Sequence, residues 1–292
     1  MAEHSVGYRH LDAERLRNAL VDQGPYADVQ IAEQVGSTNA AMLAAADESP
    51  GPAHLSALLA EHQTAGRGRL DRQWLDQPGT SILASVMLRP DPAAPLVASW
   101  LPLVAGLAVC RALQPAIPLP VNLVWPNDVV VELPPHPPAD SVPGWGRQRK
   151  LAGILAQTGQ ANSQATRGIV LGVGVNVTQQ AGELPVDWAA SVRTAGGDWH
   201  DRTGLAVAVL TELARHYAAW QAGDEELAAA VQARCVSIGQ DVTVTLPGGK
   251  TLTGRASGLD GTGALVLNRP DGRHTITAGD VRLLRQHAAN HP

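Results

Sequence analysis

Short apolar runs with few helical patterns between them constrain the fold of this chain more than any other feature. The first strand-like segment covers residues 27–35. Six further runs with the length and composition of strands lie at 55–61, 81–88, 121–125, 128–133, 151–157 and 168–177. Because several are joined directly by short turns, we expect an α+β protein. Its sheet should be mixed or antiparallel, with helices on one face, rather than doubly wound.

Helical patterns flank these runs. A short amphipathic helix is expected at 11–22, and another opens at STNAAMLAAADE (37–48), where Ser37 or Thr38 is placed to cap it. Two more helices are expected near 203–221 and 224–235.

The longest apolar run, residues 92–110, raises the question of a membrane span. Pro92, Pro95 and Pro102 interrupt it, and alanine and glycine dilute its hydrophobicity. A buried helix is the better interpretation, with Ser99 as its cap and Pro102 in its first turn, where proline is tolerated.

The composition excludes several classes of protein. The formal net charge of the 292 residues is −5, whereas a general nucleic-acid binder usually carries a basic excess, so any anion site must be local. Cys110 and Cys235 match neither a metal-binding spacing nor a disulfide framework, which suits a reducing cytoplasm. Residues 1–18 lack the apolar core of a signal peptide. We therefore expect a cytoplasmic protein that binds neither DNA nor membranes.

The composition and the hydrophobic pattern of the sequence change in two places. Residues 133–149 hold five prolines and many polar residues, so an exposed, mobile loop is expected there. After Cys235, short alternating runs are separated by turn signals at 247–249, 260–261 and 271–272. They predict a small module of about five strands, arranged as a compact barrel.

Residues 61–74, EHQTAGRGRLDRQW, place a glycine-rich loop with several positive charges directly after a buried strand. The loop contains Gly66, Arg67, Gly68, Arg69 and Arg72. Glycines let the backbone approach a ligand closely, and arginines offer planar forks for phosphate or carboxylate, which suggests an anion clamp. A solvated turn with surface arginines is the alternative. The segment does not fit an ordinary P-loop.

Three further segments allow both a structural and a functional interpretation. Asn127 and Asp128 form either a tight turn or a strand-end site for Mg²⁺ or a ribose. Lys150 is either a gatekeeper at a strand edge or a cation aimed at a carboxylate or phosphoryl group, and Gly153 indicates a close backbone approach. The run GVGVNV (172–177) resembles a dinucleotide fingerprint only superficially, because the third glycine is missing, and its glycines could merely ease sheet packing.

Common signatures of nucleophilic, zinc-dependent and dithiol catalysis are missing from the sequence. There is no G-x-S-x-G, H-E-x-x-H or C-x-x-C. His287 and His291 are four apart but lie in a polar tail without a third ligand. We therefore expect neither an enzyme nucleophile nor a histidine metal site.

Taken in order, five segments resemble the biotin–protein ligase family: STN (37–39), QTAGRGRLDRQW (63–74), WPND (125–128), KLAGIL (150–155) and GVGVN (172–176). Each motif alone is weak, but their joint order and spacing are specific. The resemblance covers roughly residues 25–285. It implies a catalytic domain like that of class II aminoacyl-tRNA synthetases, followed by an SH3-like barrel. The expected domains are residues 1–235 (with an extension at 1–24 and the proline-rich loop 133–149), residues 236–287, and a tail at 288–292.

The resemblance implies an ATP-dependent reaction in two steps. Biotin and ATP, with Mg²⁺, first give biotinyl-5′-AMP and pyrophosphate. Biotin then passes to one lysine of a biotin carboxyl carrier protein or domain of a biotin-dependent carboxylase.

Roles for individual residues are implied in the same way. The expected biotin site comprises Ser37, Thr38, Asn39, Gln63, Gly66, Arg67, Gly68, Arg69, Lys150 and Gly153. The expected ATP and adenylate site comprises Arg69, Arg72, Trp74, Asn127, Asp128, Lys150 and Asn176, with Asp128 also near Mg²⁺ and Trp74 near the adenine. Residues 37–39 and Gln63 would hold the ureido ring. The catalytic residues would be Lys150, Arg67 and Arg69, with the two arginines in a loop that closes over the intermediate.

The chemistry of these residues agrees with the implied reaction. Hydroxyls and amides match a ureido group, and each satisfied hydrogen bond contributes about 0.5–1.5 kcal/mol. Attack of a carboxylate on a phosphate brings two anions together, and positioned cations cancel that repulsion. A loop that orders over the adenylate would also shield it from water.

The chain departs from the family pattern in three places. Val124 stands where the family commonly has a lysine, and the proline-rich loop looks like an insertion. The region before the first motif is too short for the DNA-binding domain that some members carry. Two other functions stay open, a lipoate–protein ligase and a non-catalytic biotin or nucleotide sensor. An exposed sheet edge leaves a weak homodimer open as well.

Overall fold

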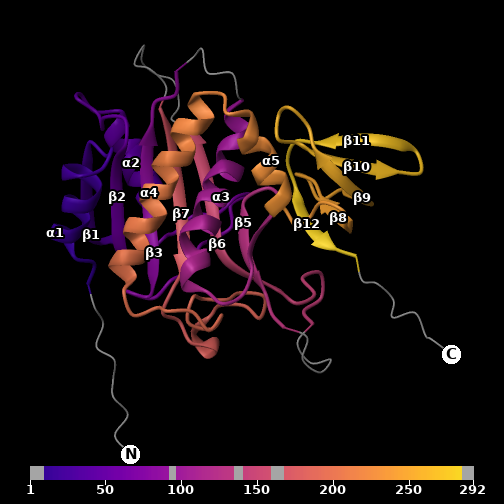
Figure 1. The fold of residues 1–292 in the computed structure, drawn as a ribbon, viewed down its shortest axis with the longest axis horizontal. Coiled ribbons are helices and arrows are strands. Elements are labelled where there is room, and N and C mark those ends of the chain that lie inside the picture. The colour runs from indigo at the N-terminus through magenta and orange to yellow at the C-terminus, as the bar shows by residue number, and fades with distance from the viewer. Residues whose placement is uncertain (1–9, 92–96, 135–140, 159–167, 285–292) are drawn as a thin grey trace, which may run out of the picture.

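The computed structural model describes residues 10–91, 97–134, 141–158 and 168–284. Its larger sheet has seven strands in the order β1-β2-β3-β7-β6-β5-β4 (Figure 1). The strands are β1 (Asp28–Val35), β2 (Ser56–Gln63), β3 (Ser81–Leu88), β4 (Val121–Val124), β5 (Asp128–Glu132), β6 (Gln148–Thr158) and β7 (Ile169–Asn176). The first two strands are parallel and the other neighbours are antiparallel, so the predicted mixed sheet is confirmed.

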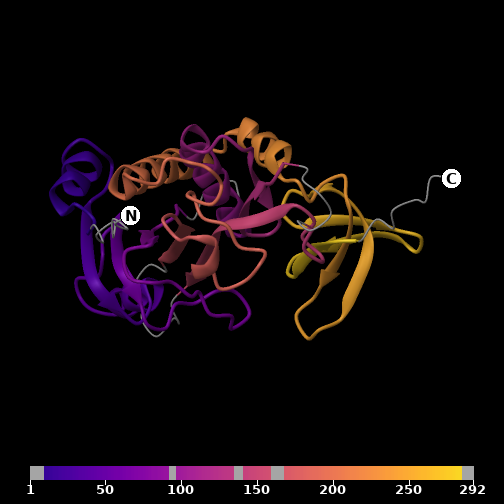
Figure 2. The same cartoon turned by 90° about the horizontal axis from the view of Figure 1, so that it is seen from below.

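Most of the helices cover one face of this sheet (Figure 2). They are α1 (Ala13–Arg17) with the π-helical turn η1 (Asn18–Asp22), α3 (Leu101–Leu113), α4 (Arg202–Gln221) and α5 (Glu225–Arg234). Side chains alternate along a strand, and Ile82, Ala84, Val86 and Leu88 of β3 belong to the large core beneath these helices. Burial of each large apolar side chain there stabilises the fold by about 1.5–3 kcal/mol.

Helix α2 (Thr38–Ala46) lies on the opposite face of the sheet. Its Met42 packs with Met87 of β3 and Val170 of β7 in a small cluster that is separate from the large core. Ser37 is the N-cap, as predicted, and its hydroxyl accepts a hydrogen bond from the backbone N–H of Ala40. Because α2 covers only part of this second face, the rest is left for a site.

Helix α3 begins differently from the prediction. A short 3₁₀ turn, η2 (Ala98–Trp100), precedes it, and no side chain caps it. The prediction that Ser99 is the cap is wrong, because its hydroxyl donates instead to the carbonyl oxygen of Thr262 in the C-terminal module. Pro102 does lie in the first turn. Pro92 and Pro95 lie outside the described residues. Within the described ranges, no helix is both long and apolar enough to cross a membrane.

A second sheet of five antiparallel strands follows α5, as predicted, in the order β11-β10-β9-β8-β12. Its strands are β8 (Asp241–Thr245), β9 (Thr251–Leu259), β10 (Leu265–Arg269), β11 (Gly272–Ile276) and β12 (Asp280–Leu283). Two indoles join it to the larger unit. Trp100 Nε1 donates to Gly261 O and Trp125 Nε1 donates to Gly263 O, both at 3.0 Å.

The proline-rich segment is not exposed throughout, in contrast to the prediction. Residues 135–140 lie outside the described part of the chain. Beyond them, Trp145 is only 4% exposed and Arg149 only 7%, and β6 already begins at Gln148. Gly144 and Gly146 take positive φ angles on either side of Trp145, which bends the chain into a tight turn with the indole inside.

Candidate functional site

A cavity of about 430 Å³ lies on the face of the sheet that α2 only partly covers. It is enclosed by β6 and β7, by the segment that links β2 to β3, and by the first residue of β12. We call residues 64–76 of that linking segment the arginine loop. Except for Gly66, all the residues proposed from the sequence line this cavity: Ser37, Thr38, Asn39, Gln63, Arg67, Gly68, Arg69, Arg72, Trp74, Asn127, Asp128, Lys150, Gly153 and Asn176.

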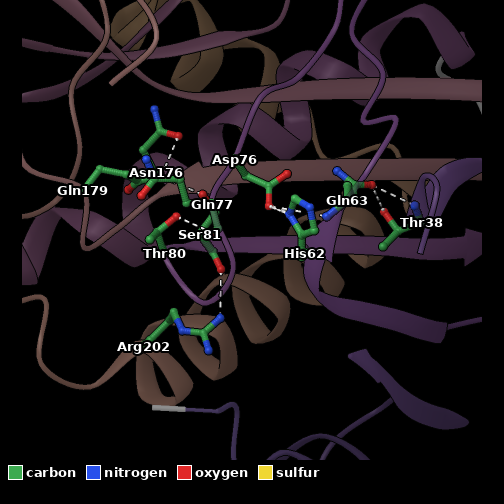
Figure 3. A network of polar contacts seen from close by, with 10 residues as sticks. All are labelled: Thr38, His62, Gln63, Asp76, Gln77, Thr80, Ser81, Asn176, Gln179 and Arg202. Carbon is green, nitrogen blue, oxygen red and sulfur yellow. Dashed lines mark hydrogen bonds and ion pairs between the residues drawn. The ribbon is translucent and has the colours of Figure 1, made fainter. Parts of the chain in front are cut away.

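Hydroxyls and amides are concentrated at the α2 end of the cavity. Gln63 Oε1 accepts hydrogen bonds from Thr38 N at 2.7 Å and Thr38 Oγ1 at 3.1 Å (Figure 3). The Ser85 hydroxyl lies 2.7 Å from Thr38 Oγ1 and 2.6 Å from Asn39 Oδ1. Asn39 Nδ2 in turn donates to Gln157 Oε1 at 2.9 Å. Ser85 and Gln157 were missed from the sequence, although a serine in the apolar run SILASVML was a visible signal for the first.

The end of the arginine loop is anchored beside this cluster. Asp76 Oδ2 lies 2.9 Å from Nδ1 of His62 and accepts the backbone N–H of Gln63 at 3.3 Å (Figure 3). Burial raises the pKa of the Asp76 carboxyl, and its hydrogen bond with His62 opposes that shift. The loop therefore returns to the sheet at a fixed point next to Gln63.

Three glycines form the floor of the cavity, and this explains the GVGV run. A Cβ at Gly174 would lie 2.8 Å from the Trp74 ring, and one at Gly153 would lie 3.0 Å from it. A Cβ at Gly172 would lie 2.3 Å from Asn39 Oδ1. The two strands pair Gly153 with Gly174, so the Trp74 ring rests on a strip without side chains. Its centroid is 5.7 Å from Nζ of Lys150.

Charged groups meet at the other end of the cavity. Lys150 Nζ lies 2.6 Å from Asp128 Oδ1. Arg69 Nη1 donates to Asn127 Oδ1 and to the carbonyl oxygen of Gly279, both at 3.2 Å, and burial lowers the pKa of its guanidinium.

A carboxylate from the second sheet joins these groups. Arg72 forms an ion pair with Asp280, the first residue of β12. Asp280 was missed, because nothing in its local sequence predicts that the C-terminal sheet reaches the cavity. Arg67 is exposed, and the described part of the chain offers it no ion-pair partner.

The two asparagines of the predicted nucleotide site also hold the backbone. Asn127 Nδ2 donates to Ile154 O at 2.8 Å, so the turn interpretation of WPND and its place at the cavity are both supported. Asn176 is buried, and its Nδ2 donates to Ala190 O at 3.0 Å.

Among the described residues, no group of three histidine, cysteine or acidic side chains is arranged to hold a metal ion. The carboxylates of the cavity wall are Asp128 and Asp280, and each is paired with a cation. Mg²⁺ commonly binds through one or two carboxylates together with substrate phosphates. Asp128 fits that mode of binding, whereas a metal cage made by the protein alone is not present in these ranges. His287 and His291 lie outside the described residues.

One wall of the cavity comes from a segment that sequence reasoning did not single out. Pro185, Val186, Trp188 and Ala189 line it. The Lys150 N–H donates to Trp188 O at 2.7 Å, and Ala190 N–H donates to Lys150 O at 2.7 Å. This wall is therefore joined directly to the lysine.

Comparison with known proteins places the chain in a family. Residues 31–176 match the biotin/lipoate A/B protein ligase family, and residues 237–284 match the biotin protein ligase C-terminal domain. The chain belongs to the biotin/lipoate A/B protein ligase family.

Its similarity to individual members extends over most of its length. It is 38% identical to the biotin–[acetyl-CoA-carboxylase] ligase of Mycobacterium tuberculosis, over 94% of this chain and 96% of that protein. It is 30% identical to the bifunctional ligase/repressor BirA of Bacillus subtilis, over 77% of this chain and 65% of that protein. Among solved structures, the biotin protein ligase of Aquifex aeolicus in complex with biotin and ATP is similar, with a TM-score of 0.70 at 26% identity. That match covers 89% of this chain and 100% of the other.

Proposed function

We propose that this protein is an ATP-dependent biotin–protein ligase. It activates biotin to biotinyl-5′-AMP, releases pyrophosphate, and transfers biotin to a lysine of a biotin carboxyl carrier protein. One observation carries the proposal: a single cavity combines a cluster of hydroxyls and amides, a glycine floor and four cationic side chains, Arg67, Arg69, Arg72 and Lys150.

The cavity suits biotin at its α2 end. A ureido group offers one carbonyl acceptor and two N–H donors, and Thr38, Asn39 and Gln63 present both kinds of partner there. The rest of the biotin ring system is apolar and would lie beside the Trp74 ring, which itself covers Gly153 and Gly174. This orientation directs the valeryl carboxylate towards Lys150.

Adenylation is then a displacement at the α-phosphorus. A biotin carboxylate oxygen forms a bond to the α-phosphorus while the bond between that phosphorus and the pyrophosphate oxygen breaks. The step therefore requires neither a proton transfer nor an enzyme nucleophile. Lys150 and the loop arginines reduce the repulsion between the two anions. Asp128 would hold Mg²⁺ together with the substrate phosphates, and the ion would supply further charge neutralisation there.

Transfer completes the reaction. The neutral amine of the acceptor lysine attacks the acyl carbon, AMP leaves with the bonding electrons, and the nitrogen releases its extra proton to solvent as the amide forms. Because the mixed anhydride reacts readily with water, closure of the arginine loop protects it until the acceptor arrives.

Lipoate is the nearest competing substrate. Its dithiolane ring has no ureido group, so lipoate would make none of the hydrogen bonds that a ureido group can form with Thr38, Asn39 and Gln63. A non-catalytic sensor would bind biotin or nucleotide without releasing pyrophosphate.

One experiment separates these functions. Pyrophosphate release is measured with purified protein, ATP and Mg²⁺, and with biotin, lipoate or neither acid. Release only with biotin supports the proposal. Release only with lipoate would reassign the substrate, and binding of biotin without any release would make the protein a sensor.

Several further properties are part of the proposal. We place the protein in the cytoplasm, where ATP and carboxylases occur, and its two cysteines are free and buried. The acceptor is a carboxylase carrier domain, DNA is not a partner, and any homodimer is weak. We place the domain boundary after residue 235, which the separate family matches at 31–176 and 237–284 support.

A further inference from the structure

Three flat groups from distant parts of the chain form a column behind the cavity. The rings of Trp145 and Trp188 stack with centroids 4.9 Å apart and an interplanar angle of 4°. On Trp145, the guanidinium carbon of Arg282 lies 4.5 Å from the ring centroid. The column therefore runs from the C-terminal sheet, through the tight turn near the end of the proline-rich segment, to the cavity wall.

The backbone around Trp145 is built to hold this column. Gly144 has a φ of 77°, and a Cβ there would lie 3.2 Å from the Arg282 side chain. Leu283 N–H donates to Gly144 O at 2.9 Å, which joins β12 to the turn. Trp145 itself is 4% exposed. The Trp145 ring is therefore held between the guanidinium of Arg282 and the indole of Trp188.

Trp188 connects the column to Lys150 and to the wall of the cavity. Its carbonyl oxygen accepts the N–H of Lys150 at 2.7 Å, and the residue is half-buried and belongs to the cavity wall. A ring that stacks on Trp145 cannot turn without losing that contact. The orientation of the Trp188 ring is therefore set from outside the cavity.

We propose that Trp145 and Arg282 are positioning residues for the nucleotide, because they hold the Trp188 ring in the plane in which it stacks on the adenine of ATP. This inference rests on the proposed function. Biotin is a saturated bicycle, and pyrophosphate has no ring, so the purine is the one flat aromatic group that the reaction brings into the cavity. The turn that carries Trp145 belongs to the proline-rich segment 133–149.

The test compares the effect of each variant on KM for ATP with its effect on KM for biotin. In Trp145→Ala, we expect KM for ATP to rise about three- to tenfold, as the loss of one ordered stacking contact would give, while KM for biotin changes less than twofold. Trp145→Phe, which keeps a flat ring, should restore most of the affinity. Loss of the far-ultraviolet exciton band of stacked indoles in the circular dichroism spectrum would report that the column itself is broken in the alanine variant.

The chain offers a matched control. Arg193 lies over the ring of Trp199 with the same 4.5 Å separation, away from the cavity. Arg282→Ala should weaken ATP binding, whereas Arg193→Ala should not. Thermal unfolding of each variant checks that it is folded.

Three results would overturn the inference: an unchanged KM for ATP in a folded Trp145→Ala protein that has lost the exciton band, equal rises in both KM values, or equal effects of the two arginine variants. Calorimetric titration with ATP alone gives the same comparison without turnover. A wild-type protein that binds ATP but releases no pyrophosphate would contradict the proposed function. The ratio of the Kd values for ATP of wild type and Trp145→Ala would still decide the role of the column.

Discussion

Lys150 on β6 and Asp128 on the neighbouring strand β5 form an ion pair in the cavity, with Nζ 2.6 Å from Oδ1. Without substrate, the aspartate neutralises the lysine. When the carboxylate of biotin and the triphosphate of ATP enter the cavity, their negative charges can share Lys150 with Asp128 or replace Asp128 as its partner. The pair keeps a half-buried cation in one position before the substrate anions arrive.

Lys150→Ala should remove most of the adenylation activity and leave the protein folded. Loss of one positioned charge at a reacting phosphate typically lowers kcat by about 10²–10³-fold. Pyrophosphate release with biotin and ATP measures this. Lys250, the only other lysine of the chain, is exposed beyond β8 and provides the control as Lys250→Ala. Near-normal release from folded Lys150→Ala would refute the role of the lysine.

Asp280→Asn should loosen the arginine loop in the ligand-free protein. Arg72 would lose its ion-pair partner, and because the Arg72 side chain is 47% exposed, the pair contributes at most about 1 kcal/mol. Limited proteolysis within residues 66–72 should then be up to roughly fivefold faster than in the wild type. Biotin and ATP together should protect the loop in both proteins.

Asp271→Asn is the matched change, since Asp271 pairs with Arg269 and His274 on the same sheet but does not line the cavity. Equal cleavage rates in all three proteins would show that Asp280 does not hold the loop.

Gly174→Ala should impair biotin binding, because the new methyl group would collide with Trp74 at 2.8 Å. Overpacking of this kind costs about 1–3 kcal/mol, so the Kd for biotin should rise on the order of tenfold. Gly182→Ala serves as the control, as nothing lies within 4 Å of a Cβ at that position. Calorimetric titration of both variants gives the comparison. Wild-type affinity in Gly174→Ala would mean that the glycine floor does not shape the biotin site.

His216 should make the folded state sensitive to acid. The residue is 1% exposed, and burial lowers the pKa of its imidazole below the ordinary value of 6.5. As the pH falls through 6.5, the unfolded chain therefore takes up a proton before the folded protein does. The free energy of unfolding decreases on the acid side of that value and is fully retained above it.

His216→Gln should flatten the decline in the free energy of unfolding between pH 7 and pH 5, as measured by urea denaturation. His200, whose side chain is 73% exposed, supplies the control variant His200→Gln, which should keep the wild-type slope. A parallel decline in all three proteins would assign the acid sensitivity to other groups.

Much of this fold could be predicted from the local pattern of apolar and polar residues, for physical reasons. Apolar runs of strand length, such as 81–88, became buried strands because alternate side chains can face a core on both sides of the sheet. The cavity motifs converged because they lie in adjacent strands and the connections between them. Ser99 was misassigned, because a serine before an apolar run satisfies the same pattern whether it caps the helix or bonds to a distant carbonyl.

The contributions of the second sheet could not be predicted. Asp280 and Arg282 reach the cavity and its supporting column only through the packing of two sheets, and no local periodicity encodes that contact. Trp145 was hidden for a related reason. Proline and glycine around it indicate a loop, and composition does not distinguish a solvated loop from a tight turn that buries one indole.

The position of Asp280 also matters for how the protein is made. Of the residues that line the cavity, Ala189 precedes Asp280 by a long stretch of chain that contains α4, α5 and most of the second sheet. At about 5–20 residues per second, a ribosome needs on the order of ten seconds to cover that stretch. During that interval the seven strands of the larger sheet are already synthesised, yet the arginine loop has no partner for Arg72. A nascent chain therefore lacks this ion pair, and the arginine loop gains it only when the start of β12 has been synthesised.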